Sequence, residues 1–198
     1  MKKTKHIYLI VSGIFLAIGF LGFAISPIIF DNRISNYNSE INDFEHYRQV
    51  ASDNLTDASD WYKFAGITSN FATVVSVLNA DNEIIKRLKT DYIYESKFAL
   101  NSLFISMKSA KGEFDIDEDE MWEKWKNISE PKDFFEYQKK YSSLAMSEFD
   151  KLEETIRNKK NQIKKIESTR RWIWVICIIF QTFGMFLGTY DSYIKDVN

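Results

Sequence analysis

The sequence predicts an all-α protein in which two transmembrane helices, at the chain termini, flank a helical-bundle or antiparallel coiled-coil domain. Residues 7–30 and 172–190 are uncharged, apolar runs of about 24 and 19 residues, each long enough to cross a bilayer as a helix. Apolar residues at heptad spacing continue from both runs into the middle of the chain. Only seven Gly and two Pro occur among 198 residues, fewer turn residues than a sheet protein needs.

The first apolar run is expected to remain in the protein as a membrane anchor. It follows a short basic start, as a cleaved secretion signal would, and cleavage is the alternative. However, the run is longer than the usual signal core. The small-x-small pair near its end, Ala24 and Ser26, would place Pro27 directly after the cut. A retained anchor therefore fits this segment better.

Heptad stripes beyond each run predict two long helices. Apolar residues recur at spacings of three and four from 145 to 187, which predicts one unbroken helix over residues 131–190. A similar register runs from 34 to 62. Because both stripes start at the same membrane face, they can pair as an antiparallel stalk. Alternatively, each stripe is the buried face of a compact bundle.

The middle of the chain is predicted to form a distal helical cap. Apolar positions from Ile84 to Met107 fit one side of a helix, which Lys111 and Gly112 should end. Residues 64–80 carry no charge but are too few for a span, so we expect a buried helix there, with a re-entrant membrane segment as the alternative. The predicted segments are a basic tail (1–6), the first span (7–30), a stalk helix (31–62), the cap (63–130), a stalk helix with a basic juxtamembrane segment (131–171), the second span (172–190) and a short tail (191–198).

Catalytic and metal-binding motifs are not expected. Only two histidines occur, His6 in the basic tail and His46 on the stalk. Their positions argue against a Ser-His-Asp or Cys-His catalytic arrangement. The single cysteine, Cys177, lies inside the second span and leaves no disulfide or cysteine metal motif. Acidic residues within 115–119 resemble the start of a calcium loop, but Lys126 occupies the place of the bidentate glutamate. We therefore predict no enzymatic activity, no metal and no cofactor.

Small and polar residues inside the spans are the first candidate functional group. Gly184 and Gly188 form a GxxxG pair, and Gly13 and Ala17 form a small-xxx-small pair, which lets helix backbones approach closely in lipid. Gln181 lies at the midpoint of the second span, where its amide needs another helix or a water-filled lumen. These five residues are predicted to form helix contacts, to hold a homo-oligomer together or to line a pore.

A basic segment beside the second span is the second candidate group. Its cations suit a bilayer with anionic headgroups and a cytoplasmic position. The candidate lipid- or ligand-contacting residues are Lys159, Lys160, Lys164, Lys165, Arg170 and Arg171. The basic N-terminal tail favours the opposite orientation, but more cations lie on the domain side, so the central domain is predicted to be cytoplasmic rather than external. A net charge of −2 and the lack of interleaved aromatic residues argue against nucleic acid as a partner.

Two functions fit these features. The first is an oligomeric effector in the cell membrane, whose helical domain receives a protein partner or a small ligand and shifts its transmembrane helices, for example to open a channel. The second is an external helical sensor or scaffold. Its order of span, helical domain and span is similar to the ligand-binding regions of bacterial chemoreceptors, in architecture and not in any motif. Since about eight residues follow the second span, a sensor of this kind would need a separate signalling partner.

Overall fold

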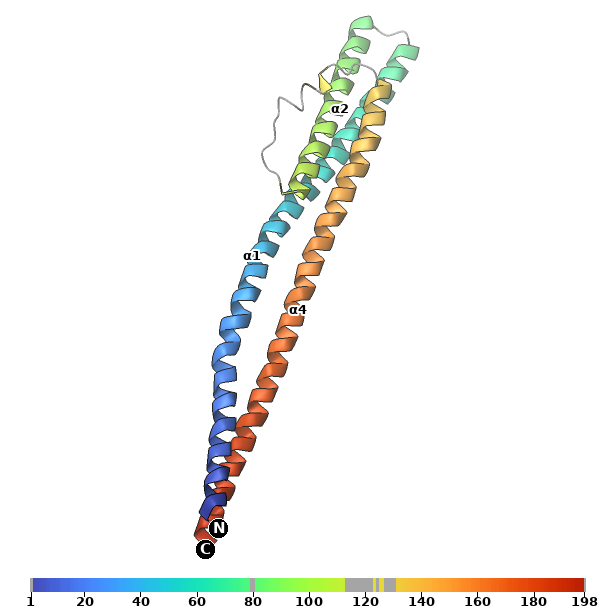
Figure 1. Cartoon of the computed structure of the whole chain (residues 1–198). Coiled ribbons are helices and arrows are strands. Elements are labelled where there is room, and N and C mark those ends of the chain that lie inside the picture. Colours follow the sequence, from blue (N-terminus) through green and yellow to red (C-terminus); the bar gives the residue numbers. More distant parts are fainter. Residues whose placement is uncertain (1, 79–80, 113–122, 124, 127–130, 198) are drawn as a thin grey trace. The chain divides into compact units, whose positions relative to one another are not determined.

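A computed structural model describes residues 2–78, 81–112, 123, 125–126 and 131–197. Within these ranges the three long regular elements are all helices, and no strand occurs (Figure 1). They are α1 (Lys2–Val77), α2 (Asn82–Ala110) and α4 (Pro131–Val197). The prediction of an all-α chain is therefore confirmed.

Both apolar runs belong to much longer helices. The helices long and apolar enough to cross a membrane cover Ile7–Val77 and Asp133–Tyr190, which are 71 and 58 residues long. The prediction that two spans flank a distinct domain is not supported, because neither α1 nor α4 has an end where the polar sequence begins. The sequence contains no Gly or Pro between Pro27 and Gly66, or between Pro131 and Gly184, so nothing local ends either helix there.

The helix ends follow local signals in the sequence. At the start of α2, the Asp81 carboxylate accepts a hydrogen bond of 3.0 Å from the backbone N–H of Glu83. At its other end, the Lys111 N–H bonds the carbonyls of Met107 and Lys108, and Gly112 has a φ of 77°. The α4 helix begins at Pro131 with Asp133 in its first turn, both favourable at that end. The predicted end at Lys111–Gly112 and the predicted start at Pro131 are both confirmed.

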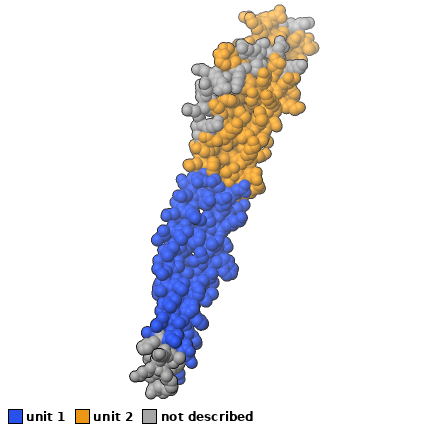
Figure 2. Space-filling model, viewed as in Figure 1, with its two compact units in different colours: residues 1–41, 158–198 blue, residues 42–157 orange. Residues whose placement is uncertain are grey.

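The chain divides into two compact units (Figure 2). Unit 1 contains residues 1–41 and 158–198, and unit 2 contains residues 42–157. In unit 1, α1 and α4 form an antiparallel pair: the rings of Tyr8 and Tyr190 lie 6.3 Å apart, and Arg170 forms an ion pair with Asp31. The described residues of unit 1 belong to these two antiparallel helices, and we call the pair the hairpin.

Unit 2 is a three-helix bundle in which α2 and α4 both run antiparallel to α1. One buried cluster joins the three helices through Ala58, Leu103 and Ala145. A second buried cluster brings Trp125 into contact with α2 and the start of α4; its buried members are Leu100, Phe104, Trp125 and Phe134. The rings of Tyr137 and Tyr141 meet Trp125 edge-on at 5.4 and 5.2 Å.

Small residues bring α1 and α2 close together in unit 2. Ala51, Ala58 and Ala65 recur every seven residues on α1 and are at most 2% exposed. Ser106 of α2 is fully buried, and its hydroxyl donates a 2.8 Å hydrogen bond to the Ala51 carbonyl. This hydrogen bond offsets the cost of removing the hydroxyl from water.

Residues 64–77 are helical as predicted, but the prediction that this segment is buried is wrong; residues 79 and 80 lie outside the described residues. Phe64, Ile67 and Phe71 are 55%, 64% and 56% exposed. The bundle covers α1 here through its small residues, such as Ala65, which is 2% exposed. Phe64, Ile67 and Phe71 are spaced three and four residues apart, so they share one face of α1. Ala65 lies on a different face, the one that packs in the bundle.

Candidate functional site

The hairpin of unit 1 is built on a seam of small residues. Ser12, Gly19 and Ser26 recur every seven residues on α1 and are all buried. On α4, Cys177 and Gly184 have the same spacing and are also buried. A seven-residue repeat keeps side chains on one face of a helix, so each set forms a continuous stripe toward its partner. Small residues at such positions let two helices pack closely in lipid.

Side chains of the partner helix fill the space beside three glycines of this seam. A Cβ atom on Gly22 would lie 2.3 Å from the Sγ atom of Cys177. One on Gly19 would lie 2.5 Å from Cγ of Gln181, and one on Gly184 would lie 2.9 Å from Cγ of Leu16. Such distances are shorter than contacts between carbon or sulfur atoms, so a larger residue at any of these positions would require the neighbouring side chain or the helices to shift.

Polar groups in the seam find partners within the hairpin. The Ser12 hydroxyl donates a buried 2.6 Å hydrogen bond to the Gly184 carbonyl, and the Trp174 indole N–H donates one of 3.0 Å to the Ser26 hydroxyl. Both bonds link α1 to α4. In lipid such bonds are worth about 0.6 kcal/mol on average, so they add mainly register and direction to the pairing.

The structure places the predicted contact residues on two different faces. Gly184 is buried against α1, Gly188 lies opposite the Ser12 hydroxyl, and Gln181 is half-buried with its Cγ atom beside Gly19. Gly13 and Ala17 are exposed, and no described atom outside the local helix lies within 4 Å of a Cβ built on Gly13. The structure thus brings Gln181, Gly184 and Gly188 into the hairpin seam and leaves Gly13 and Ala17 outside it.

Sequence reasoning missed the serine and glycine stripe of α1, which consists of Ser12, Gly19 and Ser26. Its signal is the seven-residue spacing of small residues, which is present in the sequence. The small-xxx-small motif favours pairs four residues apart and so led to Gly13 and Ala17 instead.

Two of the six basic candidates are held by contacts inside the hairpin. Lys159 forms an ion pair with Glu40, and its Nζ lies 5.4 Å from the centre of the Tyr37 ring. Arg170 pairs with Asp31 and lies over the Trp174 ring at 5.4 Å. Both cations are therefore partly neutralised by α1.

The other four basic candidates are exposed. At 100° per residue, Lys160, Lys164 and Arg171 fall within an arc of about 40° on α4, while Lys165 lies about 100° to one side. Trp172 follows Arg171 directly and is 67% exposed. A row of cations next to an exposed aromatic residue suits the headgroup region of a bilayer.

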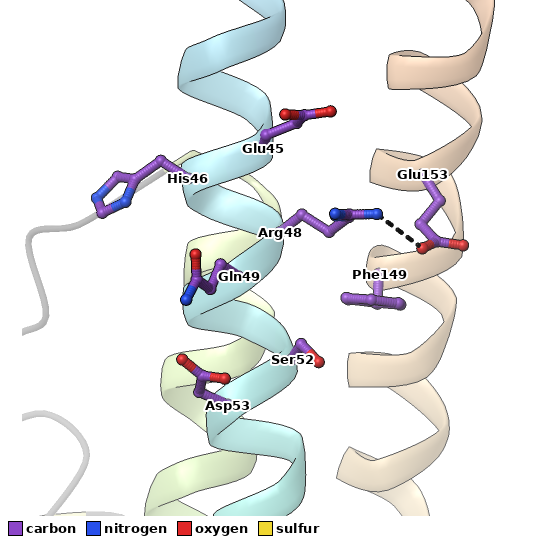
Figure 3. Close-up of a pocket in the computed structure, with 8 residues that line it drawn as sticks. All are labelled: Glu45, His46, Arg48, Gln49, Ser52, Asp53, Phe149 and Glu153. Carbon is purple, nitrogen blue, oxygen red and sulfur yellow. Dashed lines mark ion pairs between the residues drawn. The ribbon is translucent and has the colours of Figure 1, made fainter.

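A polar groove of about 610 Å³ lies between α1 and α4 in unit 2 (Figure 3). Across it, Arg48 faces Glu153 at 3.7 Å, whereas His46 points away from this pair. Both partners of the ion pair are about half exposed, so the pair contributes at most about 1 kcal/mol. The lining residues are Glu45, His46, Arg48, Gln49, Ser52, Asp53, Phe149 and Glu153.

A second groove in unit 2 is more apolar and has a volume of about 440 Å³. Leu103 of α2 lies at this groove, and the rims come from α1 and α4. Phe135 and Met146 of α4 line it and are 58% and 55% exposed. Exposed apolar side chains around a groove suit a protein or hydrophobic ligand better than a metal or a charged substrate.

Comparison with known proteins assigns no chemistry to these features. No protein-family model, curated protein or solved structure matches this chain. Within the parts of the chain that the structure describes, no three His, Cys, Asp or Glu side chains are placed to hold a metal ion. The acidic segment at 115–119 lies outside the described residues.

Proposed function

We propose that this chain is an integral membrane protein, anchored by the hairpin of unit 1. One observation carries the proposal: only 17% and 11% of the residues in the apolar windows of α1 and α4 are buried within the chain. The core helix of a soluble protein buries most of its apolar residues. Here side chains such as Ile14, Ile18 and Ile178 face outward, 44–53% exposed. We call these outward-facing apolar side chains of unit 1 the apolar belt. A bilayer would cover the belt, whereas exposure of this apolar surface to water would be unfavourable in free energy.

Membrane insertion is tested by placing a charge in the belt. Ile18→Arg should lower the fraction of protein that resists carbonate extraction and floats with vesicles, since arginine at mid-span costs about 2.5–3.5 kcal/mol. Asn38→Arg adds the same charge at an exposed polar position of α1 and should insert like the wild type. Release of the wild-type protein by carbonate would overturn the proposal.

The hairpin supports a non-enzymatic effector whose helical domain receives a partner and acts on the membrane helices. The α4 helix is continuous from Pro131 to Val197, so a rotation on one side of Arg157 passes along an unbroken hydrogen-bonded backbone. The apolar groove beside Leu103 is the surface that we propose receives the partner. Since the seam of one hairpin is filled by side chains, a channel would have to form between several copies.

An insertion series separates an effector from a passive anchor. Three alanines inserted after Glu167 rotate the rest of α4 by about 300°, whereas seven alanines return it to within about 20° of its original face. The three-residue insertion should abolish bilayer conductance, or any other signal that the wild type gives, and the seven-residue insertion should keep part of it. Equal activity of the two variants would favour a sensor or scaffold that uses the helices only as anchors.

We propose that residues 42–157 are cytoplasmic. Exposed cations of α4, such as Lys164 and Arg171, lie in the sequence between these residues and the apolar run of α4, and cations beside a span favour the cytoplasmic side. Protease added to intact spheroplasts should leave residues 42–157 uncut, and permeabilisation should expose them. Cleavage in intact cells would support the external sensor or scaffold instead.

A further inference from the structure

A second apolar stripe runs along α1 on a face that the bundle of unit 2 does not cover. Its members are spaced three and four residues apart, and each is 54–73% exposed: Phe64, Ile67, Phe71, Val74 and Leu78. At 100° per residue they fall within an arc of about 80°. We call this set the outer stripe.

The outer stripe is as large as the largest apolar patch that a monomeric protein typically exposes. Its exposed area is about 500 Å², taking on the order of 150–200 Å² for each fully exposed side chain. The largest apolar patch on a monomeric protein is typically about 300–600 Å² and is often functional. No charged residue occurs from 64 to 80, so only uncharged polar side chains accompany the stripe within this segment.

We infer that the outer stripe is the contact surface of a homodimer, in which α1 helices of two copies pack as a two-stranded coiled coil. The spacing is that of alternate a and d positions, with Phe64 and Phe71 at a and Ile67 and Val74 at d. This inference goes beyond the proposed function, because the surface lies in unit 2 and not in the membrane hairpin.

The positions beside the seam do not oppose pairing with a second copy of the chain. The positions beside the seam are Lys63, Thr68, Asn70, Val75 and Val77, which include a single charge. Coiled coils select foreign partners through complementary charges at these positions, and like charges there repel self-association. The positions beside the outer stripe carry almost no charge, so two copies would repel each other little there.

The buried area is sufficient for a specific contact. Two copies would together bury about 1,000 Å², the lower bound for a specific protein–protein interface. A lipid surface is a poorer partner. A helix that lies on lipid is typically rich in cations along its polar face, whereas the flanks here carry one cation, Lys63, beside Thr68 and Asn70.

Charge substitution on the seam tests this inference. In the full chain, solubilised in mild detergent, Ile67→Glu together with Val74→Glu should convert a dimer to a monomer by light scattering, with helical circular dichroism unchanged. Ile84→Glu together with Leu144→Glu changes two apolar side chains that are 49% and 40% exposed elsewhere in unit 2, and it should leave the dimer intact. A monomeric wild type at tens of micromolar would overturn the inference, as would a dimer that survives the seam variant.

Cross-linking gives a second measurement that does not depend on charged variants. In a Cys177→Ala background, Ile67→Cys should form a covalent dimer under mild oxidation if the two helices are parallel. If they are antiparallel, Ile67→Cys should instead cross-link to a copy that carries Val74→Cys. Absence of both products would refute the seam. Binding of the wild-type protein to added anionic vesicles through the outer stripe, without any dimer, would identify lipid as the occupant and refute the homodimer.

Discussion

The contact between Gly22 and Cys177 provides a direct test of the hairpin seam. A Cβ atom on Gly22 would lie 2.3 Å from Sγ of Cys177 but 3.9 Å from its Cβ atom. The first distance is a severe overlap, and the second is an ordinary van der Waals contact. Gly22→Ala should therefore push the helices apart, whereas Cys177→Ala removes the atom that the new methyl group would meet.

The expected energies follow from this geometry. Gly22→Ala overpacks the seam, which typically costs about 1–3 kcal/mol. Cys177→Ala removes one buried sulfur atom and should cost about 1 kcal/mol. If the effects were independent, the double variant would lose both amounts. Because the small alanine side chains fit each other, it should lose only about 1 kcal/mol, which corresponds to a coupling of about 1–3 kcal/mol.

The assay is unfolding of the full chain in mixed micelles by SDS, followed by fluorine NMR of incorporated fluorotryptophan. Trp174 reports on the seam, since its ring lies 6.1 Å from that of Phe23 and its N–H binds Ser26. Gly13→Ala is the matched control and should change stability by no more than a few tenths of a kcal/mol. A double variant as unstable as the sum of its parts would refute the reasoning, as would a Gly13 variant as unstable as the Gly22 variant.

Two further predictions concern unit 2. Ala51→Leu should lower the melting temperature by at least several degrees, because Ala51 is fully buried beside Ser106 and overpacking costs about 1–3 kcal/mol. The control Asp57→Leu, at an exposed position of α1, should change the melting temperature little. Equal shifts for the two variants would contradict the close approach of α1 and α2. The hydrogen bond from Lys151 lowers the pKa of Glu148, so its contribution to stability is present at neutral pH and is lost as pH falls through the lowered pKa. Since Lys151 is 67% exposed, Glu148→Gln should lower the free energy of unfolding by at most a few tenths of a kcal/mol at pH 7 and should not change it in acid. Chemical denaturation at both pH values measures this difference. A larger loss of stability in acid than at pH 7 would contradict the assignment.

Features with a local physical cause could be predicted from the sequence. The scarcity of Gly and Pro indicated long helices, Gly112 marked the end of α2, and Pro131 marked the start of α4. Each depends on the backbone preferences of one or a few residues, which do not need a neighbouring helix to act. The unbroken helix predicted over residues 131–190 lies within α4, because a change from apolar to polar residues alters the surroundings of a helix but does not end it.

The faces that pack together were decided only by the tertiary structure. Periodicity shows that Ser12 and Gly19 share a stripe, and that Gly13 and Ala17 share another, but it does not show which stripe meets α4. The same ambiguity misplaced residues 64–80, since both a buried face and an outer stripe fit their spacing. Helical periodicity and composition by themselves determined that this chain is helical and which residues share a face. Burial of a face requires a second helix at a fitting distance, and that property belongs to a pair of segments distant in sequence.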